Sequence, residues 1–233
     1  MNKLEIIGIT GLPEFKEGDN LGEEILKCVS SQNIELKNKC ILVVAQKVVS
    51  KVEGQIQKIL NEEDFNTLVS AESQKIIRKR GKTVIAQTKH GFVCANVGID
   101  RSNIKKGYAL LLPENPDESA KKIRNHIEHS LDIEVGVIIS DTFGRAWRNG
   151  QINVAIGISG IAPIKSYIGE NDSFGNELNV TQIAIADELS SAAELVMGKT
   201  EHIPVAIVNN YEFNKSEQDI KEIIRKESED YFL

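Results

Sequence analysis

The densest group of chemically capable side chains lies in one short segment, Asp141-Thr142-Phe143-Gly144-Arg145-Ala146-Trp147-Arg148-Asn149-Gly150. Arginine forks bind phosphate or carboxylate bidentately, and glycines let backbone N–H groups approach an anion. The segment is therefore typical of a site for a phosphorylated or polycarboxylate substrate, with Arg145 and Arg148 as candidate catalytic residues. The alternative is that both arginines pair with surface acids and that Trp147 fills the core.

Two aspartates, Asp100 and Asp141, follow apolar segments that the sequence predicts as strands, and each lies in a predicted turn that contains glycine. Open sheets present ligand-binding residues beyond the ends of their strands. Hard divalent cations take carboxylate and hydroxyl oxygens, so Asp100, Asp141 and Thr142 are candidate ligands of Mg²⁺ or Mn²⁺, with water and substrate phosphates as the other ligands. The alternative is that each aspartate caps a turn or a helix.

Two lysines, Lys47 and Lys51, come directly after an apolar run typical of a buried strand. A lysine at such a point can meet a nucleotide phosphate as a compact point charge, although most lysines are simply solvated. The chain has neither a Walker-type phosphate loop nor the glycine fingerprint of a Rossmann fold. A triphosphate site here would therefore have another design.

Other catalytic patterns are absent from the sequence. None of the four histidines has metal-ligand spacing to another, and no serine-hydrolase motif marks a nucleophile. The three cysteines, Cys28, Cys40 and Cys94, are widely spaced, which is expected of reduced thiols. The net charge of -6 argues against a nucleic-acid partner, because neutralising many phosphates needs a basic face.

The elements that must position these residues are predicted from the hydrophobic periodicity. We expect strands at residues 4–10, 40–44, 83–87, 92–97, 135–139 and 205–208, and helices at 21–29, 63–80, 117–131 and 180–195, followed by a charged C-terminal helix. Strands and helices mix without a strict alternation, which predicts an α/β or mixed α+β class.

The bulk composition is that of an ordinary soluble protein, with 41% hydrophobic and 27% charged residues. No linker divides the 233 residues, so we expect one domain, with two lobes as the alternative. The N-terminal apolar run is interrupted by Gly8 and Gly11, unlike a signal peptide, and no window approaches the length of a membrane span. The expected location is the cytoplasm, with no membrane partner.

Several ordered segments resemble the coenzyme F420-0:L-glutamate ligase (gamma-glutamyl ligase) family. They span nearly the whole chain and are residues 11–15 (GLPEF), 48–54 (VVSKVEG), 91–96 (GFVCAN), 98–103 (GIDRSN), 140–145 (SDTFGR), 155–160 (AIGISG), 186–189 (ADEL) and 197–199 (MGK). Several motifs in the family's order are far more specific than any one of them. The sequence departs from the family where Gln46 replaces a common Ser or Thr, where Ala146 replaces a frequent proline, and where Lys199 stands in place of a Gln or Glu that lies close to a metal in some members.

The resemblance implies a GTP-dependent ligase that joins L-glutamate to coenzyme F420-0 through an acyl phosphate, giving gamma-glutamyl-linked F420-1 and longer tails. It also implies Mg²⁺ or Mn²⁺ as cofactor, help from K⁺, and an intertwined homodimer of unusual α/β fold. Relatives with a C-terminal flavin-binding domain are longer, and we expect only the ligase domain here. By this likeness Asp100, Asp141 and Thr142 hold the metals, and the GTP site is lined by Leu12, Pro13, Glu14, Phe15, Gln46, Lys51 and Asn103.

Two other functions remain open at this point. One is an enzyme of the same architecture that acts on a different carboxylate acceptor. The other is a non-catalytic GTP-binding regulator, which the complete set of Asp100, Asp141 and Thr142 disfavours. No general base for the glutamate amine is identifiable from the sequence.

Overall fold

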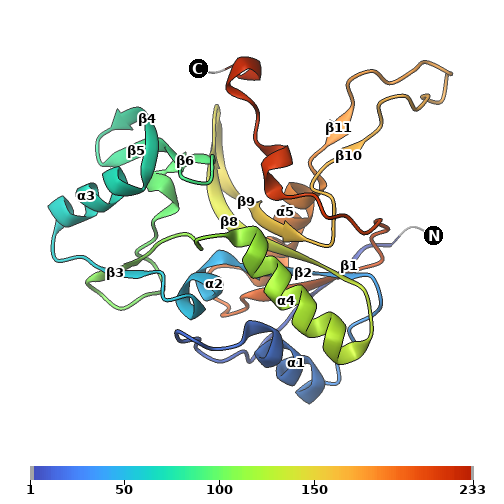
Figure 1. Cartoon of the computed structure of the whole chain (residues 1–233), viewed down its shortest axis with the longest axis horizontal. Coiled ribbons are helices and arrows are strands. Elements are labelled where there is room, and N and C mark those ends of the chain that lie inside the picture. Colours follow the sequence, from blue (N-terminus) through green and yellow to red (C-terminus); the bar gives the residue numbers. More distant parts are fainter. Residues whose placement is uncertain (1–2, 232–233) are drawn as a thin grey trace.

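The computed structural model describes residues 3–231 and shows a protein in which helices surround a mixed β-sheet (Figure 1). The strand order of this central sheet is β1-β12-β2-β8-β9. Its strands are β1 (Glu5–Gly8), β2 (Cys40–Ala45), β8 (Val135–Arg145), β9 (Arg148–Ser159) and β12 (Val205–Asn209). β2 and β8 run parallel, and the other neighbouring pairs are antiparallel. The mixed α/β class expected from the sequence is confirmed.

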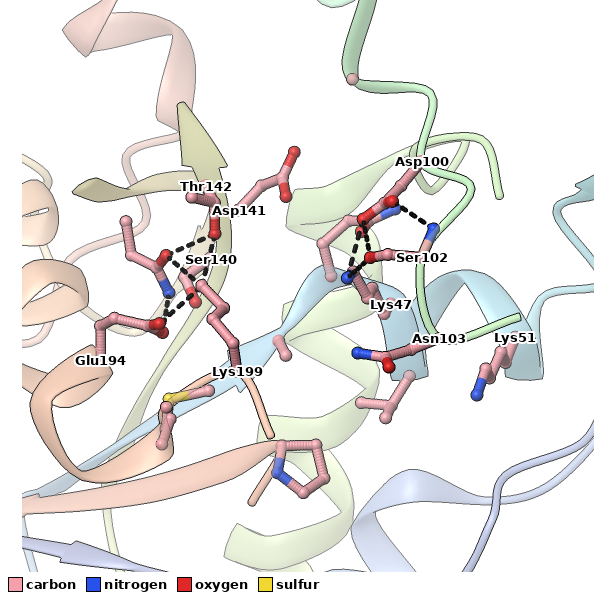
Figure 2. A pocket seen from close by; sticks show the side chains of 18 of the residues that line it. Lys47, Lys51, Asp100, Ser102, Asn103, Ser140, Asp141, Thr142, Glu194 and Lys199 are labelled. Carbon is pink, nitrogen blue, oxygen red and sulfur yellow. Dashed lines mark hydrogen bonds and ion pairs between the residues drawn. The ribbon is translucent and has the colours of Figure 1, made fainter. Parts of the chain in front are cut away.

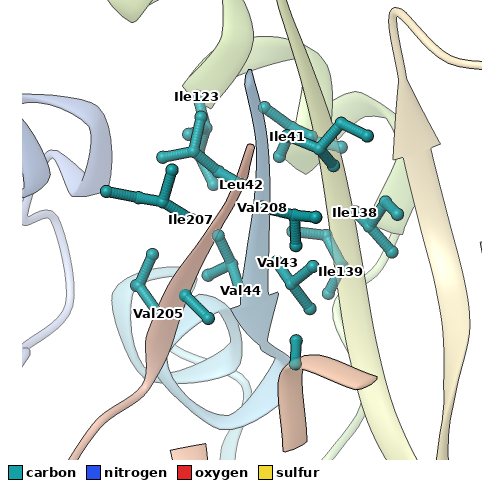
Figure 3. Close-up of a cluster of buried hydrophobic side chains, with 14 of the residues drawn as sticks. Ile41, Leu42, Val43, Val44, Ile123, Ile138, Ile139, Val205, Ile207 and Val208 are labelled. Atoms are coloured by element: carbon teal, nitrogen blue, oxygen red, sulfur yellow. The ribbon is translucent and has the colours of Figure 1, made fainter. Parts of the chain in front are cut away.

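The main hydrophobic core lies on both faces of this sheet. β2 and β12 are apolar along nearly their whole length because both of their faces are covered (Figure 3). The covering helices are α1 (Leu21–Ser31), α4 (Pro116–Leu131) and α5 (Ile185–Met197). α1 packs beside α4, while α4 and α5 both contact β9, from different sides of the sheet (Figure 1).

Helix ends follow the local sequence. The side chains of Asn20 and Asn115 cap α1 and α4, each accepting a backbone N–H from the first turn. Pro116 begins α4, where its missing N–H costs nothing. The helices expected at 21–29 and 117–131 are therefore confirmed, as are the strands expected at 40–44 and 205–208.

A smaller lobe carries a second hydrophobic cluster, which includes Phe65, Val69, Ala86, Val97 and Leu111. It contains α3 (Glu62–Glu72), the sheet β4 (Ser73–Arg80), β5 (Thr83–Thr88) and β6 (Val93–Ala95), and the pair β3 (Ile56–Lys58) and β7 (Tyr108–Leu110). The helix expected at 63–80 was wrong in its second half. Residues 73–80 instead form β4, because a tight turn at Gly81, with φ of +58°, folds them onto β5.

Two further expectations were wrong in their boundaries or type. Residues 180–184 are not helical, because Gln182–Ile183 forms β11 and pairs with β10 (Lys165–Ser166) in a hairpin that projects from the body (Figure 1). After β12 the chain does not form the expected C-terminal helix. It makes only 3-10 turns, η2 (Ile220–Ile223) and η3 (Glu227–Glu229), and η2 is held by contact with β9 and by a hydrogen bond from the Ile220 N–H to Asp117.

No helix within residues 3–231 has both the length and the apolar character needed to cross a bilayer.

Candidate active site

The site forms where two parallel strands end at the same edge of the central sheet. In the register of β2 and β8, Ala45 lies beside Ser140. The chain leaves β2 directly into the short helix α2 (Gln46–Val52), while β8 continues through Asp141 and Thr142. The carboxyl ends of parallel strands are the usual place for ligands in such sheets. The sequence therefore brings the polar residues after β2 next to those in the second half of β8.

A cavity of about 760 Å³ opens at this edge, a volume within the range of small-molecule sites. The structure brings all of the metal and nucleotide residues expected from the sequence into its lining: Leu12, Pro13, Glu14, Phe15, Gln46, Lys51, Asp100, Asn103, Asp141 and Thr142. They come from segments spread over more than half of the chain. Their roles as ligands remain predictions.

The local structure around Asp141 differs from the expected turn. Asp141 and Thr142 lie inside β8, opposite Val154 and Asn153 of β9. β8 extends past the end of β2 because β9 supplies a complete antiparallel partner there. Asp141 is thus held by a two-stranded ribbon with a register irregularity at Ile139–Ser140, not by a loop.

Asp100 lies across the cavity from Asp141, and the side chain of Lys47 and the backbone of Ser102 hold it in place (Figure 2). Its Oδ2 lies 2.8 Å from Lys47 Nζ, and its Oδ1 accepts the Ser102 backbone N–H at 2.6 Å. Lys47 Nζ also donates to Ser102 Oγ at 2.6 Å. Burial acts to raise the pKa of Asp100, but the hydrogen bonds from Lys47 and Ser102 outweigh it, and the pKa lies below its ordinary value.

Asp141 lies in a different electrostatic environment. Burial is the largest cause that raises the pKa of its carboxyl to about 6, and the negative charge of Asp100 adds to the rise, against opposing effects of the Thr142 backbone, Lys47 and Lys199. Among the described residues, no side chain makes a hydrogen bond or salt bridge to Asp141. A carboxylate near a second carboxylate and without a side-chain partner is a group that a cation would stabilise.

The donor set fits a hard divalent ion that keeps part of its shell for substrate. Asp100 and Asp141 supply carboxylate oxygens, the preferred ligands of Mg²⁺ and Mn²⁺. Within residues 3–231 there is no cluster of three or more His, Cys, Asp or Glu residues placed to hold a metal. An ion here would therefore take its remaining ligands from water and phosphate oxygens, as Mg²⁺ commonly does.

Thr142 belongs to a network that closes the other end of the cavity (Figure 2). Its hydroxyl donates to Asn153 Oδ1 at 2.7 Å, and Asn153 Nδ2 donates to Glu194 Oε2 at 2.8 Å. Lys199 Nζ donates to Thr142 Oγ1 at 2.7 Å and forms an ion pair with Glu194. The Thr142 oxygen expected to bind a metal is thus already in contact with an ammonium group.

The nucleotide side of the cavity has one notable ion pair. Lys51, on α2, is 13% exposed and pairs with Glu14, which is 78% exposed. Exchanging Glu14 for a nucleotide phosphate as the partner of Lys51 would cost little free energy, because an ion pair with an exposed partner contributes little to stability. Gln46 is buried and donates to Ser50 Oγ at 2.8 Å and to the Leu111 carbonyl at 3.0 Å. Its amide therefore fixes α2 against the smaller lobe.

The structure does not bring Arg145 and Arg148 into the lining of the cavity. Both lie at the tip of the β8–β9 hairpin, where Arg145 Nη2 donates to the Asn149 carbonyl at 2.6 Å. Trp147 is 86% exposed at the same tip, so the interpretation that it fills the core was wrong. The catalytic role of Arg145 and Arg148 stays a prediction, and it would require the hairpin tip to contact substrate or a second chain.

Three polar lining residues that contact the candidate side chains were not expected from the sequence: Ser102, Asn153 and Glu194. The sequence did carry a signal for two of them. Asn153 interrupts the apolar run of β9, and Glu194 interrupts the apolar run of α5. A polar residue at a buried position must find a partner, but the sequence does not say that the partner is Thr142.

The chain is similar to known proteins over nearly its whole length. Residues 10–210 match the family model described as F420-0:Gamma-glutamyl ligase. A protein of Methanocaldococcus jannaschii named coenzyme F420:L-glutamate ligase is 41% identical, over 99% of this chain and 97% of that protein. Proteins of the same name from Methanococcus maripaludis and Methanothermobacter thermautotrophicus are 40% and 36% identical, over 99% and 98% of this chain and 97% and 98% of theirs.

Proposed function

The chain belongs to the F420-0:gamma-glutamyl ligase family, and from this premise we propose that it is a GTP-dependent ligase that adds L-glutamate to coenzyme F420-0. The observation that carries the proposal is the convergence of the expected nucleotide and metal residues on one cavity. The names of the relatives give the acceptor class and the amino acid. The use of GTP rests on the resemblance of residues 11–15 and 48–54 and on the positions of Lys51 and Asn103 in the lining.

In the proposed reaction the acceptor's terminal carboxylate takes the γ-phosphoryl group of GTP. The carboxylate oxygen forms the new P–O bond, the bond to the β-phosphate oxygen breaks, and GDP leaves. The amine of L-glutamate then attacks the acyl carbon of the acyl phosphate, so that an amide forms while inorganic phosphate leaves and the amine loses a proton. Each addition creates a new terminal carboxylate, which makes repeated addition chemically possible.

The residues of the cavity have distinct tasks in this proposal. Lys51 exchanges Glu14 for a nucleotide phosphate, and Lys47 keeps Asp100 ionised and oriented. Asp100 and Asp141 would hold Mg²⁺ or Mn²⁺, which when bound neutralises charge that develops on the transferring phosphoryl group. A contribution of K⁺ and the roles of Arg145 and Arg148 stay predictions.

The direct test is a mass-spectrometric assay of the purified protein with F420-0, L-glutamate, GTP and Mn²⁺ or Mg²⁺. We expect the acceptor to gain mass in glutamate-sized steps, with GDP released only when acceptor and glutamate are both present. Controls omit each reactant in turn, and one replaces GTP with ATP. GDP release without any glutamate addition would sink the named acceptor, while tight GTP binding without turnover would favour a regulator.

We also propose that the protein is a homodimer, as the resemblance implies, with the projecting β10–β11 hairpin as part of the interface (Figure 1). Three large apolar side chains of this arm are exposed: Ile168 by 52%, Phe174 by 90% and Val180 by 84%. A cluster of exposed apolar residues on a protruding element is typical of a surface that is covered by another chain.

A charged substitution on the arm tests this assembly. We expect the wild-type protein to have twice the 25.8 kDa mass of one chain in light scattering, and Phe174→Asp to shift it to the mass of a single chain, because burying an unpaired carboxylate is costly. The matched control is Leu60→Asp, since Leu60 is 76% exposed in the smaller lobe. An unchanged dimer in the Phe174 variant would exclude the arm from the interface.

A further inference from the structure

The side-chain ammonium of Lys199 lies in a cage of three oxygen atoms at one end of the cavity (Figure 2). Lys199 Nζ is 2.7 Å from Thr142 Oγ1, 3.3 Å from Asn153 Oδ1 and 2.5 Å from Glu194 Oε1. An ammonium group has three donors and no acceptor. The three oxygens therefore match its full hydrogen-bonding capacity, and they come from β8, β9 and α5.

The cage is rigid independently of the lysine. Asn153 is 4% exposed, accepts the Thr142 hydroxyl through Oδ1, and donates through Nδ2 to Glu194 Oε2. The Asn153 backbone carbonyl also accepts the Ser191 hydroxyl at 2.7 Å, which ties β9 to α5. These contacts fix where the three oxygens point, so they would remain converged on a cation if the ammonium were removed.

The backbone delivers Lys199 to this cage through a conformation that favours glycine. Gly198 ends α5 with φ of +60°, and a Cβ atom there would lie 1.9 Å from Glu201 Oε2. Only a residue without a side chain allows the chain to turn so tightly at this point. The Met197-Gly198-Lys199 sequence thus places the ammonium beside Thr142.

A hydroxyl, an amide oxygen and a carboxylate are the ligand types that hard metal cations take in proteins. A lysine ammonium is also a compact positive charge, but it is part of the chain and does not have to bind from solution as a metal ion does. We propose that Lys199 is a built-in cation that determines the metal stoichiometry of the site. The cavity then takes a single divalent ion at Asp100 and Asp141, and the ammonium fills the position of a second cation.

The charges of the cavity agree with this assignment. Lys199 offsets the charge of Glu194, and Lys47 offsets that of Asp100, which leaves the Asp141 carboxylate without a side-chain partner among the residues described. One divalent ion at Asp141 and Asp100 would bring the sum of these charges from −1 to +1, an excess that the negative phosphates of bound GTP would offset. A second ion in the cage would have to displace the ammonium from all three oxygens.

This inference rests on the proposed metal-dependent function, and counting bound ions tests it without relying on ligase activity. The probes are Mn²⁺ and Rb⁺, which stand for divalent and monovalent cations, each measured by equilibrium dialysis and elemental analysis in the presence of GTP. We expect about one Mn²⁺ per wild-type chain, and one additional Mn²⁺ or Rb⁺ in Lys199→Met, because the emptied cage keeps its oxygens.

Two further variants locate the additional ion. Lys199→Met combined with Glu194→Gln should lose it again, since the cage then has no charge. Lys27→Met is the matched control, because Lys27 also pairs with two carboxylates, Glu23 and Glu24, but on α1 and outside the cavity lining. This control should bind as many ions as the wild type.

Contradicting outcomes separate the inference from the proposed function. Two Mn²⁺ ions in the wild-type chain, or no additional ion in a folded Lys199→Met protein, would overturn the role of Lys199 and leave the ligase proposal intact. If Lys199→Met does not fold, the number of Mn²⁺ ions bound per wild-type chain decides alone whether Lys199 takes the place of a second cation. No Mn²⁺ in any of the proteins would overturn the metal site itself, and the inference with it.

Discussion

Asp141→Asn is expected to lower ligase activity by about a thousandfold while making the metal-free protein more stable at neutral pH. The loss of activity follows from the loss of a carboxylate that would hold the divalent ion. Charge stabilisation by a metal is worth several kcal/mol in the transition state, and each 1.4 kcal/mol corresponds to roughly tenfold in rate. The mass-spectrometric assay described above measures it directly.

The gain in stability follows from the raised pKa of this carboxyl. Below its ordinary pKa of 3.8, Asp141 is protonated in both the folded and the unfolded state. As the pH rises through the folded-state pKa of about 6, the unfolded state ionises more readily, so the free energy of unfolding decreases. Above about pH 6 the ionised carboxyl lowers the free energy of unfolding by an amount on the order of 1–3 kcal/mol, a penalty that an uncharged asparagine avoids.

Urea unfolding in the presence of a chelator measures this effect at two pH values. Near pH 7.5 the variant should unfold at a higher urea concentration than the wild type, and near pH 4 the difference should shrink, because wild-type Asp141 is then largely protonated. Asp132→Asn is the matched control, since Asp132 ends α4 with φ of +53°, a conformation that asparagine also adopts. A variant less stable than the wild type near pH 7.5 would show that Asp141 is not under electrostatic strain.

The metal and nucleotide residues expected from the sequence line one cavity, whereas several of the surrounding elements were expected with the wrong type or bounds. Lys51 and Asp141 were recognisable because Lys51 follows the apolar strand β2 and Asp141 lies beyond the apolar part of β8, and these two parallel strands end at one edge. Asp100 reaches the cavity from the smaller lobe, after β6, which is antiparallel to β5. Residues next to each other across an antiparallel pair were not predictable in the same way. The contact between Thr142 and Asn153 depends on the register of β8 and β9, which contains an irregularity at Ile139–Ser140.

The misassigned helix at residues 73–80 has a similar cause. Its charged residues and isoleucines are compatible with a helix or with an exposed edge strand, and short-range periodicity does not separate the two. Pairing with β5 decides the outcome, and β5 is positioned by the second hydrophobic cluster around Ala86 and Val97. Tertiary contacts that lie outside a local window therefore selected the strand.

Helix α4 approaches the central sheet closely at Gly157 of β9. A Cβ atom there would lie 2.4 Å from both the carbonyl carbon and the Cβ of Pro116, and 2.6 Å from the Pro116 carbonyl oxygen. Pro116 begins α4, and Asp117 next to it accepts the Ile158 N–H at 2.7 Å. The first turn of α4 is thus locked onto the backbone of β9, and the absence of a side chain at position 157 makes this contact possible.

Gly157→Ala should therefore destabilise the protein by about 3 kcal/mol or more, because a backbone contact cannot move aside as a flexible side chain can. For a chain of this size the melting temperature would fall by roughly 6–12 °C, measurable by calorimetry. Gly144→Ala is the matched control, since a Cβ at Gly144 meets nothing within 4 Å. An unchanged melting temperature for Gly157→Ala would mean that α4 shifts away at little cost. The Asp117 carboxylate would then lose its hydrogen bond to Ile158 without consequence for stability.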